Sequence, residues 1–480
     1  MKGFFDEGFF LETETAMRLY HDYAKEKPII DYHSHVNAHE IADDKHYNNI
    51  AEVWLGGDSC RWRLMRWCGV EEKYITGDAS DYEKFLAFAN ALPNAAGNPL
   101  YHLTHLELQR YFDCNLPLSP DTAEEIWQIC NKTLKRKLSV REMLKLSNVE
   151  ALCTTVDPAD DLEVFSKISN DRKISTKVYP IFSPEKSLAV NKPGFAEYVQ
   201  KLSDVCGIPI LTYDDLLDAL ASRLDYFVSC GCRLSNHAFD TVPWNFEPIY
   251  CDSIFKQAIS GERLTALETE AFQTAVMLSL GKEYSTRGVV MQLRYNTLKN
   301  VNPVYYRALG SDSGFDCINT NNSNLQLAAY LGALENAGAL PKTILYSLNP
   351  GDNAILAAMA GAFQQGSVAG RVQHGSTWWF NGAKQGIKSH LTTLAELSAL
   401  GSFVGMHTDS RGFLSYSRHE YFRRILCDLI GEWIEKGEYR SDIILSGKLV
   451  ENISYFNAAK FFWVRGNGEG VVAVESGLSS

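Results

Sequence analysis

Two histidines one residue apart follow an apolar run near the start of the chain. The stretch PIIDYHSHVN, residues 28–37, places Ser34 between His33 and His35. Side chains alternate between the two faces of a strand, so both imidazoles would point one way and Ser34 the other. Imidazole is a common ligand of divalent transition metals, so the pair is a candidate half of a metal site. The alternative is two hydrogen-bonded imidazoles at a polar strand end.

A carboxylate and a guanidinium follow another apolar run, near the end of the chain. HTDSRGF, residues 407–413, contains Asp409 and Arg411. If the backbone stays extended there, both side chains face the same cavity. A guanidinium in that place could bind a carboxylate or stabilise an enolate. The alternative is an Asp–Arg ion pair that braces a loop.

The elements that must position these residues alternate between strands and helices. Short β-rich runs have helical patterns between them, which is typical of βαβ units around a parallel sheet. The eight predicted strands lie near residues 28–33, 151–156, 176–182, 232–238, 288–294, 342–349, 371–374 and 403–408. Eight parallel strands predict an α/β fold, the (β/α)8 TIM-type barrel, whose active site forms at the C-terminal ends of the strands.

Closure of such a barrel would place the eighth strand beside the first. His33 and His35 would then lie near Asp409, and two imidazoles with one carboxylate suit a single divalent ion. Zn²⁺ is the expected metal, with Mn²⁺ and Fe²⁺ as alternatives. Further polar or aromatic residues that follow predicted strands are Asn236, His237, Arg294, Asn349, His374, Trp378, Trp379 and His407. The two tryptophans could stack on a sugar face or be plain packing under a loop.

The spacing of the strands is uneven. About 115 residues separate the first two, where a plain barrel uses one helix and its loops. We therefore predict a distorted barrel with a large, mostly helical insertion between strands 1 and 2. The predicted divisions are an N-terminal helix with strand 1 (1–37), the insertion (38–150), the remainder of the barrel (151–462) and a C-terminal tail of low order (463–480).

Composition excludes several classes of protein. The net charge is −12 with no basic cluster, which disfavours a nucleic-acid surface. No apolar run approaches the roughly 20 residues of a membrane span, and the first residues lack a signal-peptide pattern, so we expect a cytoplasmic protein. The eleven cysteines include no CxxC pair and are expected to be reduced thiols. The sequence leaves the oligomeric state open, a homo-oligomer included.

Several longer stretches identify a family. The sequence resembles the uronate isomerases, the glucuronate isomerase branch of the amidohydrolase superfamily, in IIDYHSHV, EVWLGGD, NPLYHLTHLEL, GCRLSNH, LGSDSGFD, LPKTILYSLNP, GSTWWFNGAKQG and FVGMHTDSRGFLSYSRHEYFRRILC. The resemblance runs to about Phe462. It implies a distorted (β/α)8 barrel with one divalent metal held by His33, His35 and Asp409. It also implies a sugar acid as substrate, with D-glucuronate converted to D-fructuronate or D-galacturonate to D-tagaturonate.

The implied reaction makes specific demands on a site. Moving a carbonyl from C1 to C2 of an open-chain uronate needs a base for the C2 proton, a cation or donors to hold the enediolate, and an arginine for the distal carboxylate. Asp409 could be the base or a metal ligand. Arg411 is the candidate electrophile or anion clamp.

Six positions depart from the pattern that is usual in the family. The usual residues there are a His-Tyr pair after WLGGD, an arginine on strand three, an aspartate on strand four, a histidine on strand five and an arginine after it. This chain instead has Ser59, Cys60, Ser183, Asn236, Arg294 and Lys299. Cys60 and Asn236 are the catalytic candidates among them. Arg294 and Lys299 could replace lost contacts to the substrate anion. Three further residues are also expected to contact the substrate: His237, Trp378 and Trp379.

Three hypotheses follow from the sequence. The first is an aldose–ketose isomerase that acts on a uronate. The second is a diverged hydrolase, in which a metal-bound water attacks a lactone or an amide. The third is a catalytically impaired relative that binds a sugar acid. The sequence leaves the uronate and the metal open.

Overall fold

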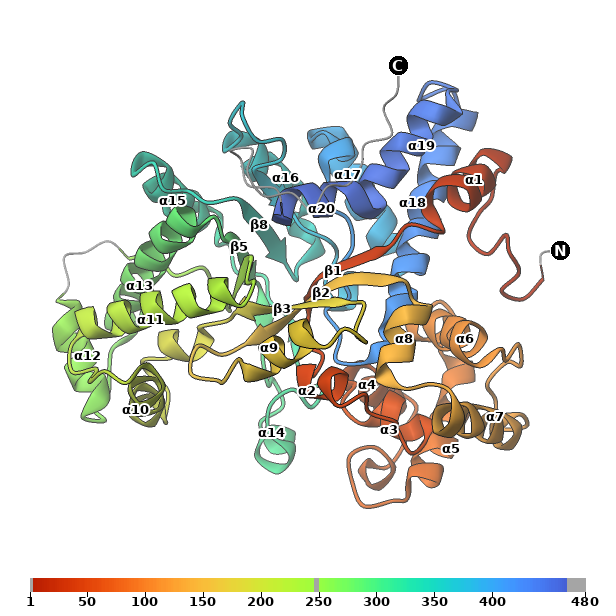
Figure 1. Ribbon diagram of the computed structural model, residues 1–480, viewed down its shortest axis with the longest axis horizontal. Coiled ribbons are helices and arrows are strands. Elements are labelled where there is room, and N and C mark those ends of the chain that lie inside the picture. Colours follow the sequence, from red (N-terminus) through yellow and green to blue (C-terminus); the bar gives the residue numbers. More distant parts are fainter. Residues whose placement is uncertain (1–2, 246–249, 464–480) are drawn as a thin grey trace.

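The fold is built around one parallel sheet. The computed structural model describes residues 3–245 and 250–463. Seven parallel strands pair in the order β1-β2-β3-β4-β5-β8-β9. Their bounds are β1 (Ile29–Ser34), β2 (Val149–Val156), β3 (Lys177–Phe182), β4 (Leu234–Ala238), β5 (Val290–Tyr295), β8 (Thr343–Ser347) and β9 (Val372–His374). Seven of the predicted strands are therefore confirmed, and helices surround the curled sheet (Figure 1).

The prediction of a strand at residues 403–408 was wrong, because no regular strand forms there. The segment still runs along β1. The Asp409 N–H donates to the His33 carbonyl at 3.0 Å, and the His35 N–H donates to the Ser410 carbonyl at 2.9 Å. One hydrogen bond uses a side chain instead of the backbone, since the Thr408 N–H donates to the Asp31 carboxylate at 2.8 Å. Asp409 has a φ of 50°, and this left-handed backbone is incompatible with a continued strand.

Most helices between β1 and β2 form a separate layer beside the C-terminal ends of the strands (Figure 1). These helices are α2 (Ala38–Ala42), α3 (Ile50–Leu55), α4 (Ser59–Trp67), α5 (Asp81–Ala91), α6 (Pro99–Phe112), α7 (Ala123–Arg136) and α8 (Val140–Leu146). Their ends are set by local chemistry. Ser80 and Glu83 form a capping box at the start of α5, and Ser139 caps α8.

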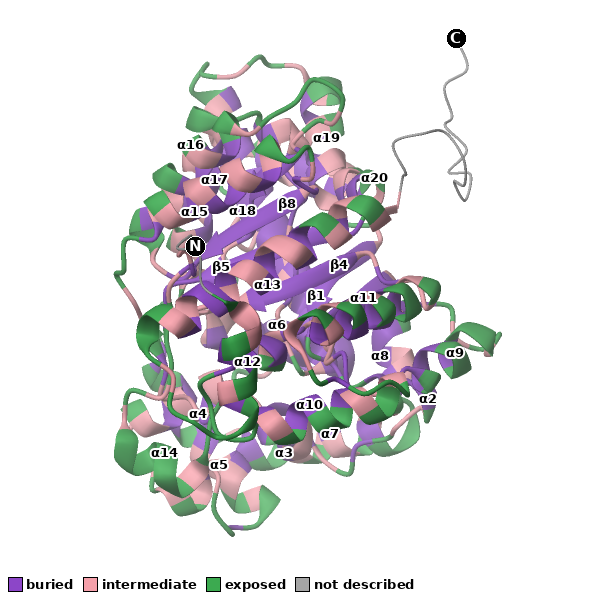
Figure 2. Ribbon diagram, turned by 90° about the vertical axis from the view of Figure 1, so that its left-hand side faces the viewer, coloured by how far each residue is buried: buried purple, intermediate pink, exposed green. Residues whose placement is uncertain are grey.

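The remaining helices cover the sheet from outside, so that the strands are buried on both faces (Figure 2). They are α1 (Glu14–Arg18), α9 (Glu163–Asn170), α10 (Phe195–Cys206), α11 (Tyr213–Ser229), α12 (Cys251–Ile259), α13 (Ala266–Arg287), α15 (Asn324–Asn336), α16 (Asn353–Ala362), α17 (Lys384–Leu397), α18 (Ser417–Glu435), α19 (Ile443–Glu451) and α20 (Asn457–Trp463). None of the helices in the described ranges is long and apolar enough to cross a membrane. All eleven cysteines are unpaired thiols. Apart from Trp463, the predicted tail lies outside the described residues.

An arm that the sequence did not predict projects from the sheet after β5. It consists of two short antiparallel strands, β6 (Thr297–Leu298) and β7 (Cys317–Ile318), on either side of α14 (Pro303–Leu309), which projects at the bottom of Figure 1. Two arginines of α4 hold its base. Arg66 donates to the Ser313 carbonyl at 2.6 Å, and Arg63 donates to the Asp316 carbonyl at 2.8 Å.

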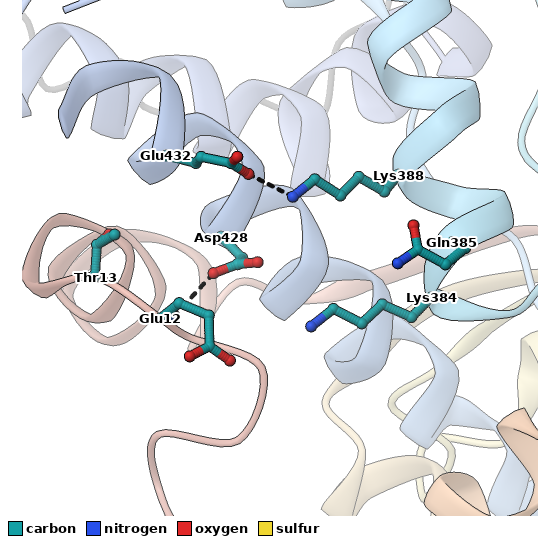
Figure 3. A pocket seen from close by; sticks show the side chains of 7 residues that line it. All are labelled: Glu12, Thr13, Lys384, Gln385, Lys388, Asp428 and Glu432. Carbon is teal, nitrogen blue, oxygen red and sulfur yellow. Dashed lines mark hydrogen bonds and ion pairs between the residues drawn. The ribbon is translucent and has the colours of Figure 1, made fainter. Parts of the chain in front are cut away.

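The N-terminal segment packs against the helices near the end of the chain. Between them lies a cavity of about 390 Å³ with lysines on α17 opposite carboxylates of α18 and the N-terminal segment (Figure 3). The Glu12 N–H donates to Asp428 at 2.9 Å, and Lys388 pairs with Glu432. The first contact joins the N-terminal segment to α18, and the second joins α17 to α18.

We expect Gly405→Ala to destabilise the protein strongly. Gly405 has a φ of 80°, and an added Cβ would lie 2.2 Å from the Ile453 carbonyl oxygen. Left-handed strain and the backbone clash together should lower the free energy of unfolding by about 2–4 kcal/mol. Urea denaturation followed by circular dichroism measures this.

The matched control is Gly437→Ala. Gly437 has a φ of 73°, and a Cβ added there would meet no described atom within 4 Å, so only the conformational strain of about 1 kcal/mol applies. Equal losses in the two variants would contradict the packing of residues 403–408 described above.

Candidate active site

A cavity of about 960 Å³ lies between the C-terminal ends of the strands and the helices α2, α3, α4 and α6. Its floor comes from β1, β4 and β5. Its walls come from α4, the base of the arm, the loop 377–382 and the segment 406–421. Of the residues singled out in the sequence, those that line it are His33, His35, Ser59, Cys60, Ser183, Asn236, Arg294, Lys299, Trp378, Trp379, Asp409 and Arg411.

His33, His35 and Asp409 meet on this floor. The Nε2 atoms of both histidines lie 3.3 Å from Oδ1 of Asp409, and the three ligand atoms lie within 4.8 Å of one another. As expected for alternating side chains, Ser34 points the other way and donates to the Cys153 carbonyl at 2.9 Å. His33 is 1% exposed, and its Nε2 has no hydrogen-bond partner among the described residues. A buried, unpartnered nitrogen facing a carboxylate fits a divalent metal ligand.

Two neighbours orient the imidazole rings. The side-chain amide of Gln292 lies 3.2 Å from Nδ1 of His33, and the Thr155 hydroxyl lies 2.7 Å from Nδ1 of His35. Both Nε2 atoms are therefore left facing Asp409. Contacts of this kind fix ring orientation in metal sites, and neither residue was predicted from the sequence. In the sequence, only their positions in the predicted strands, now β5 and β2, could have indicated that they lie near the histidines.

Arg294 and Trp378 bind the carboxylate of Asp409 from other sides. Arg294 donates to Oδ1 at 3.0 Å, and the Trp378 indole donates to Oδ2 at 2.6 Å. The Arg294 guanidinium lies 4.6 Å from the ring centre of Tyr346 and 5.0 Å from that of Trp378. These cation–π contacts fix its plane. Its Nε and Nη2 atoms are buried and have no hydrogen-bond partner among the described residues.

The protonation states of this cluster suit a metal. Burial alone would raise the pKa of Asp409, but Arg294, His35 and His33 hold it well below its usual range. Burial, reinforced by Arg294, holds the pKa of His33 well below its usual range. Asp409 is therefore a carboxylate and His33 a neutral imidazole near neutral pH, as metal binding requires.

Asn236 lies on the floor, but His237 does not. Asn236 donates to the Ser183 hydroxyl at 3.1 Å and to the Glu185 carboxylate at 3.0 Å. His237 follows it on β4 and therefore points to the opposite face, where its Nε2 lies 3.0 Å from the Tyr284 hydroxyl. His237 does not line the cavity, so the prediction that it contacts the substrate was wrong. The two unusual residues Asn236 and Ser183 form one neutral contact.

Cys60 lies on α4, which covers the cavity, and is half-buried. Burial, together with the nearby Asp58, raises the pKa of the Cys60 thiol to about 11. The thiol is therefore protonated at neutral pH and is not available as a thiolate nucleophile.

The cations near the rim differ from expectation. The backbone is not extended from Asp409 onward, because Asp409 is left-handed. Arg411 still lines the cavity, but its side chain is 54% exposed and pairs with Asp312 at 3.1 Å. Lys299 is exposed at the base of the arm. Trp379 lines the cavity with a φ of 42°, beside the buried Trp378.

The chain is similar to known proteins over nearly its whole length. The model of the glucuronate isomerase family matches residues 1–462. The uronate isomerase of Lachnospira eligens is 50% identical over 466 residues, covering 96% of this chain and 99% of that protein. The uronate isomerase of Caldicellulosiruptor saccharolyticus is 49% identical over 465 residues, covering 96% of this chain and all of that protein.

Solved structures have the same fold. The crystal structure of uronate isomerase from Thermotoga maritima has a TM-score of 0.91 at 35% identity, covering 96% of this chain and 100% of that one. That of glucuronate isomerase from Caulobacter crescentus has a TM-score of 0.88 at 20% identity, covering 96% and 97%. The second likeness concerns the fold alone.

We expect Arg294→Met to bind a divalent metal more tightly. The guanidinium occupies one side of the Asp409 oxygen that faces both histidines, and its positive charge opposes a second cation there. Removing a neighbouring like charge should raise the affinity for Zn²⁺ about tenfold or more. Competition with a chromophoric chelator measures this without turnover.

Arg411→Met is the control, since that arginine pairs with Asp312 at the rim. Its metal affinity should equal that of the unmodified protein. Unchanged or weaker binding in Arg294→Met would contradict the prediction.

Cys60 should react slowly with iodoacetamide near neutral pH. Its raised pKa leaves little thiolate, so between about pH 7 and pH 9.5 the alkylation rate should rise about tenfold per pH unit. Peptide mass spectrometry can follow Cys60 with the exposed Cys317 as an internal reference. Alkylation of Cys60 as fast as that of Cys317 at about pH 8 would exclude the raised pKa.

Proposed function

The chain belongs to the glucuronate isomerase family, and from that premise we propose how its cavity isomerises a uronate. The activity is aldose–ketose isomerisation, an intramolecular oxidation and reduction of a sugar acid. The observation that carries the proposal is the meeting of His33, His35, Asp409 and Arg294 on the cavity floor. The hydrolase and the impaired relative are not favoured, because relatives at about 50% identity are named uronate isomerases.

His33, His35 and Asp409 are the proposed ligands of one divalent ion. A bound ion would supply a Lewis acid that polarises the substrate carbonyl. Zn²⁺ is the metal we propose, with Mn²⁺ and Fe²⁺ as alternatives that the same ligands accept. Arg294 is the proposed second electrophile, because its guanidinium lines the cavity directly beside Asp409.

The isomerisation requires proton transfers at C1, C2 and their oxygens. A base must remove the C2 proton and later return a proton to C1, while O1 gains a proton and the C2 hydroxyl loses one. Asp409 is the proposed base. Its low pKa makes it a weak base, so the reaction depends on donors such as Arg294 to acidify the C2–H bond. Cys60 is the proposed proton donor to oxygen, and Asn236 is proposed to orient the substrate from β4.

The remaining polar and aromatic groups are proposed to hold the sugar acid. Arg411 and Lys299 lie at the rim, and Trp378 and Trp379 form one wall. D-glucuronate and D-galacturonate are both candidate substrates.

We also propose a distorted (β/α)8 barrel in which residues 403–410 take the place of the eighth strand. Their hydrogen bonds to β1 support this arrangement. In the proposed division, residues 1–37 and 151–462 form the barrel and residues 38–150 are the insertion. A cytoplasmic location and a homo-oligomer stay predictions.

Incubation with D-glucuronate or D-galacturonate in D₂O, followed by NMR, tests the proposed function. With metal present, we expect a ketouronate and deuterium at the exchanging carbon. Asp409→Asn should lower kcat about 10²- to 10⁴-fold, because it removes the base and a ligand. Cys60→Ala should lower kcat less, and Cys60→Ser should be intermediate. Absence of both ketouronate and exchange in the metal-loaded protein would contradict the proposal.

A further inference from the structure

One half-buried cationic side chain in the cavity has no hydrogen-bond or ion-pair partner among the described residues. Arg418 is the second residue of α18 and lines the cavity together with Cys60, Gly382 and Tyr421. It is half-buried. Within residues 3–245 and 250–463, the structure gives its guanidinium no hydrogen bond and no ion pair. Its guanidinium donors are therefore free to bind an anion in the cavity, and such charge-assisted hydrogen bonds are strong.

The other cavity cations are occupied or exposed. Each of Lys45, Arg61, Arg294 and Arg411 pairs with a carboxylate: Glu40, Glu107, Asp409 and Asp312, respectively. Arg63 donates to the carbonyls of Gly314 and Asp316 and lies over Phe380. Lys299 has no partner in the described part of the chain but is solvent-exposed, as lysines usually are. Arg418 therefore differs from them in being both sheltered and unpaired.

The surroundings of Arg418 place it beside Cys60. A Cβ on Gly382 would lie 4.0 Å from its Nη1 atom, so the guanidinium lies against the loop 377–382 that carries Trp378. Its charge lowers the pKa of the Cys60 thiol, although burial raises that pKa more. Both residues therefore face the same part of the cavity.

We propose that Arg418 binds the carboxylate of the sugar acid and thereby selects acids over neutral sugars. The inference rests on the proposed function of the cavity and assigns its anion site to a residue of α18. Arg411 is less suited, because its side chain is 54% exposed and already bound to Asp312. Arg418 offers a planar, sheltered pair of donors to which a carboxylate can bind bidentately.

A purely electrostatic role is the competing explanation. Arg61 is shared between Asp58 and Glu107, so this buried group carries a surplus of negative charge. Arg418 lies near enough to lower the pKa of Glu107, although burial raises that pKa more. Glu107 itself is engaged by Arg61 at 2.8 Å and by the Trp54 indole at 2.6 Å. If charge balance were the only role, substitution would change stability but not ligand choice.

Calorimetric binding of D-gluconate and sorbitol to the metal-loaded protein tests the proposal. Gluconate carries a carboxylate and has no carbonyl to isomerise, and sorbitol is its neutral counterpart. We expect the unmodified protein to prefer gluconate and Arg418→Met to lose about 10- to 100-fold in gluconate affinity with sorbitol unchanged. Arg418→Lys should recover part of the loss, because it keeps the charge but not the bidentate geometry.

Several outcomes would overturn the proposal. They are gluconate binding by Arg418→Met that equals the unmodified protein, equal losses for gluconate and sorbitol, or no preference for gluconate in the unmodified protein. Arg411→Met is the comparison variant, and it should lose less gluconate affinity than Arg418→Met. A larger loss in Arg411→Met would indicate that Arg411, and not Arg418, binds the carboxylate. Urea denaturation reports a stability effect separately, and if Arg418→Met does not fold, Arg418→Lys must show the weakened gluconate binding alone.

The test does not depend on turnover. Failure to isomerise any uronate would count against the proposed function, while Arg418-dependent binding of gluconate would still stand.

Discussion

The Asp409 carboxylate is the interaction on which the cavity depends. Its Oδ1 faces both histidines of β1 and accepts from Arg294 of β5, while its Oδ2 accepts from Trp378 in the loop after β9. One buried carboxylate therefore joins four segments that are far apart in the sequence. It remains ionised because Arg294 and the imidazoles outweigh its burial. The left-handed backbone at Asp409 is a local cost that these contacts offset.

The same charge arrangement organises the rest of the cavity. On the cavity floor, Arg294 forms an ion pair with Asp409. Asn236 donates one hydrogen bond to the Ser183 hydroxyl and one to the Glu185 carboxylate. Several of the cationic side chains in the rest of the cavity form ion pairs with carboxylates, as Lys45, Arg61 and Arg411 do. A site that binds an acid in a chain of net charge −12 must concentrate cations locally. The cations that α4, the arm and α18 contribute around one cavity meet this need.

Much of the scaffold could be predicted from residue patterns. Seven strands were found because each is a short, buried, β-rich run between helical patterns. The eighth failed for a physical reason. Residues 403–408 begin with the apolar run FVGM, but Gly405 and Asp409 adopt left-handed backbone, and the side chain of Asp31 replaces a backbone acceptor. The arm around α14 was missed because its strands have two residues each, too few for periodicity to register.

The sequence by itself determined the residue types of the site and their order along the chain: two imidazoles on one strand face, a carboxylate after a distant apolar run, and the resemblance that joins them. Side-chain alternation is local, so it also placed Ser34 opposite the histidines. Only the tertiary structure decided which polar groups share a cavity. It turned His237 away, paired Arg294 with Asp409 and Arg411 with Asp312, and left Arg418 without a partner within the described ranges. Such pairings join residues 47 to 115 positions apart in the sequence, a separation that local patterns do not encode.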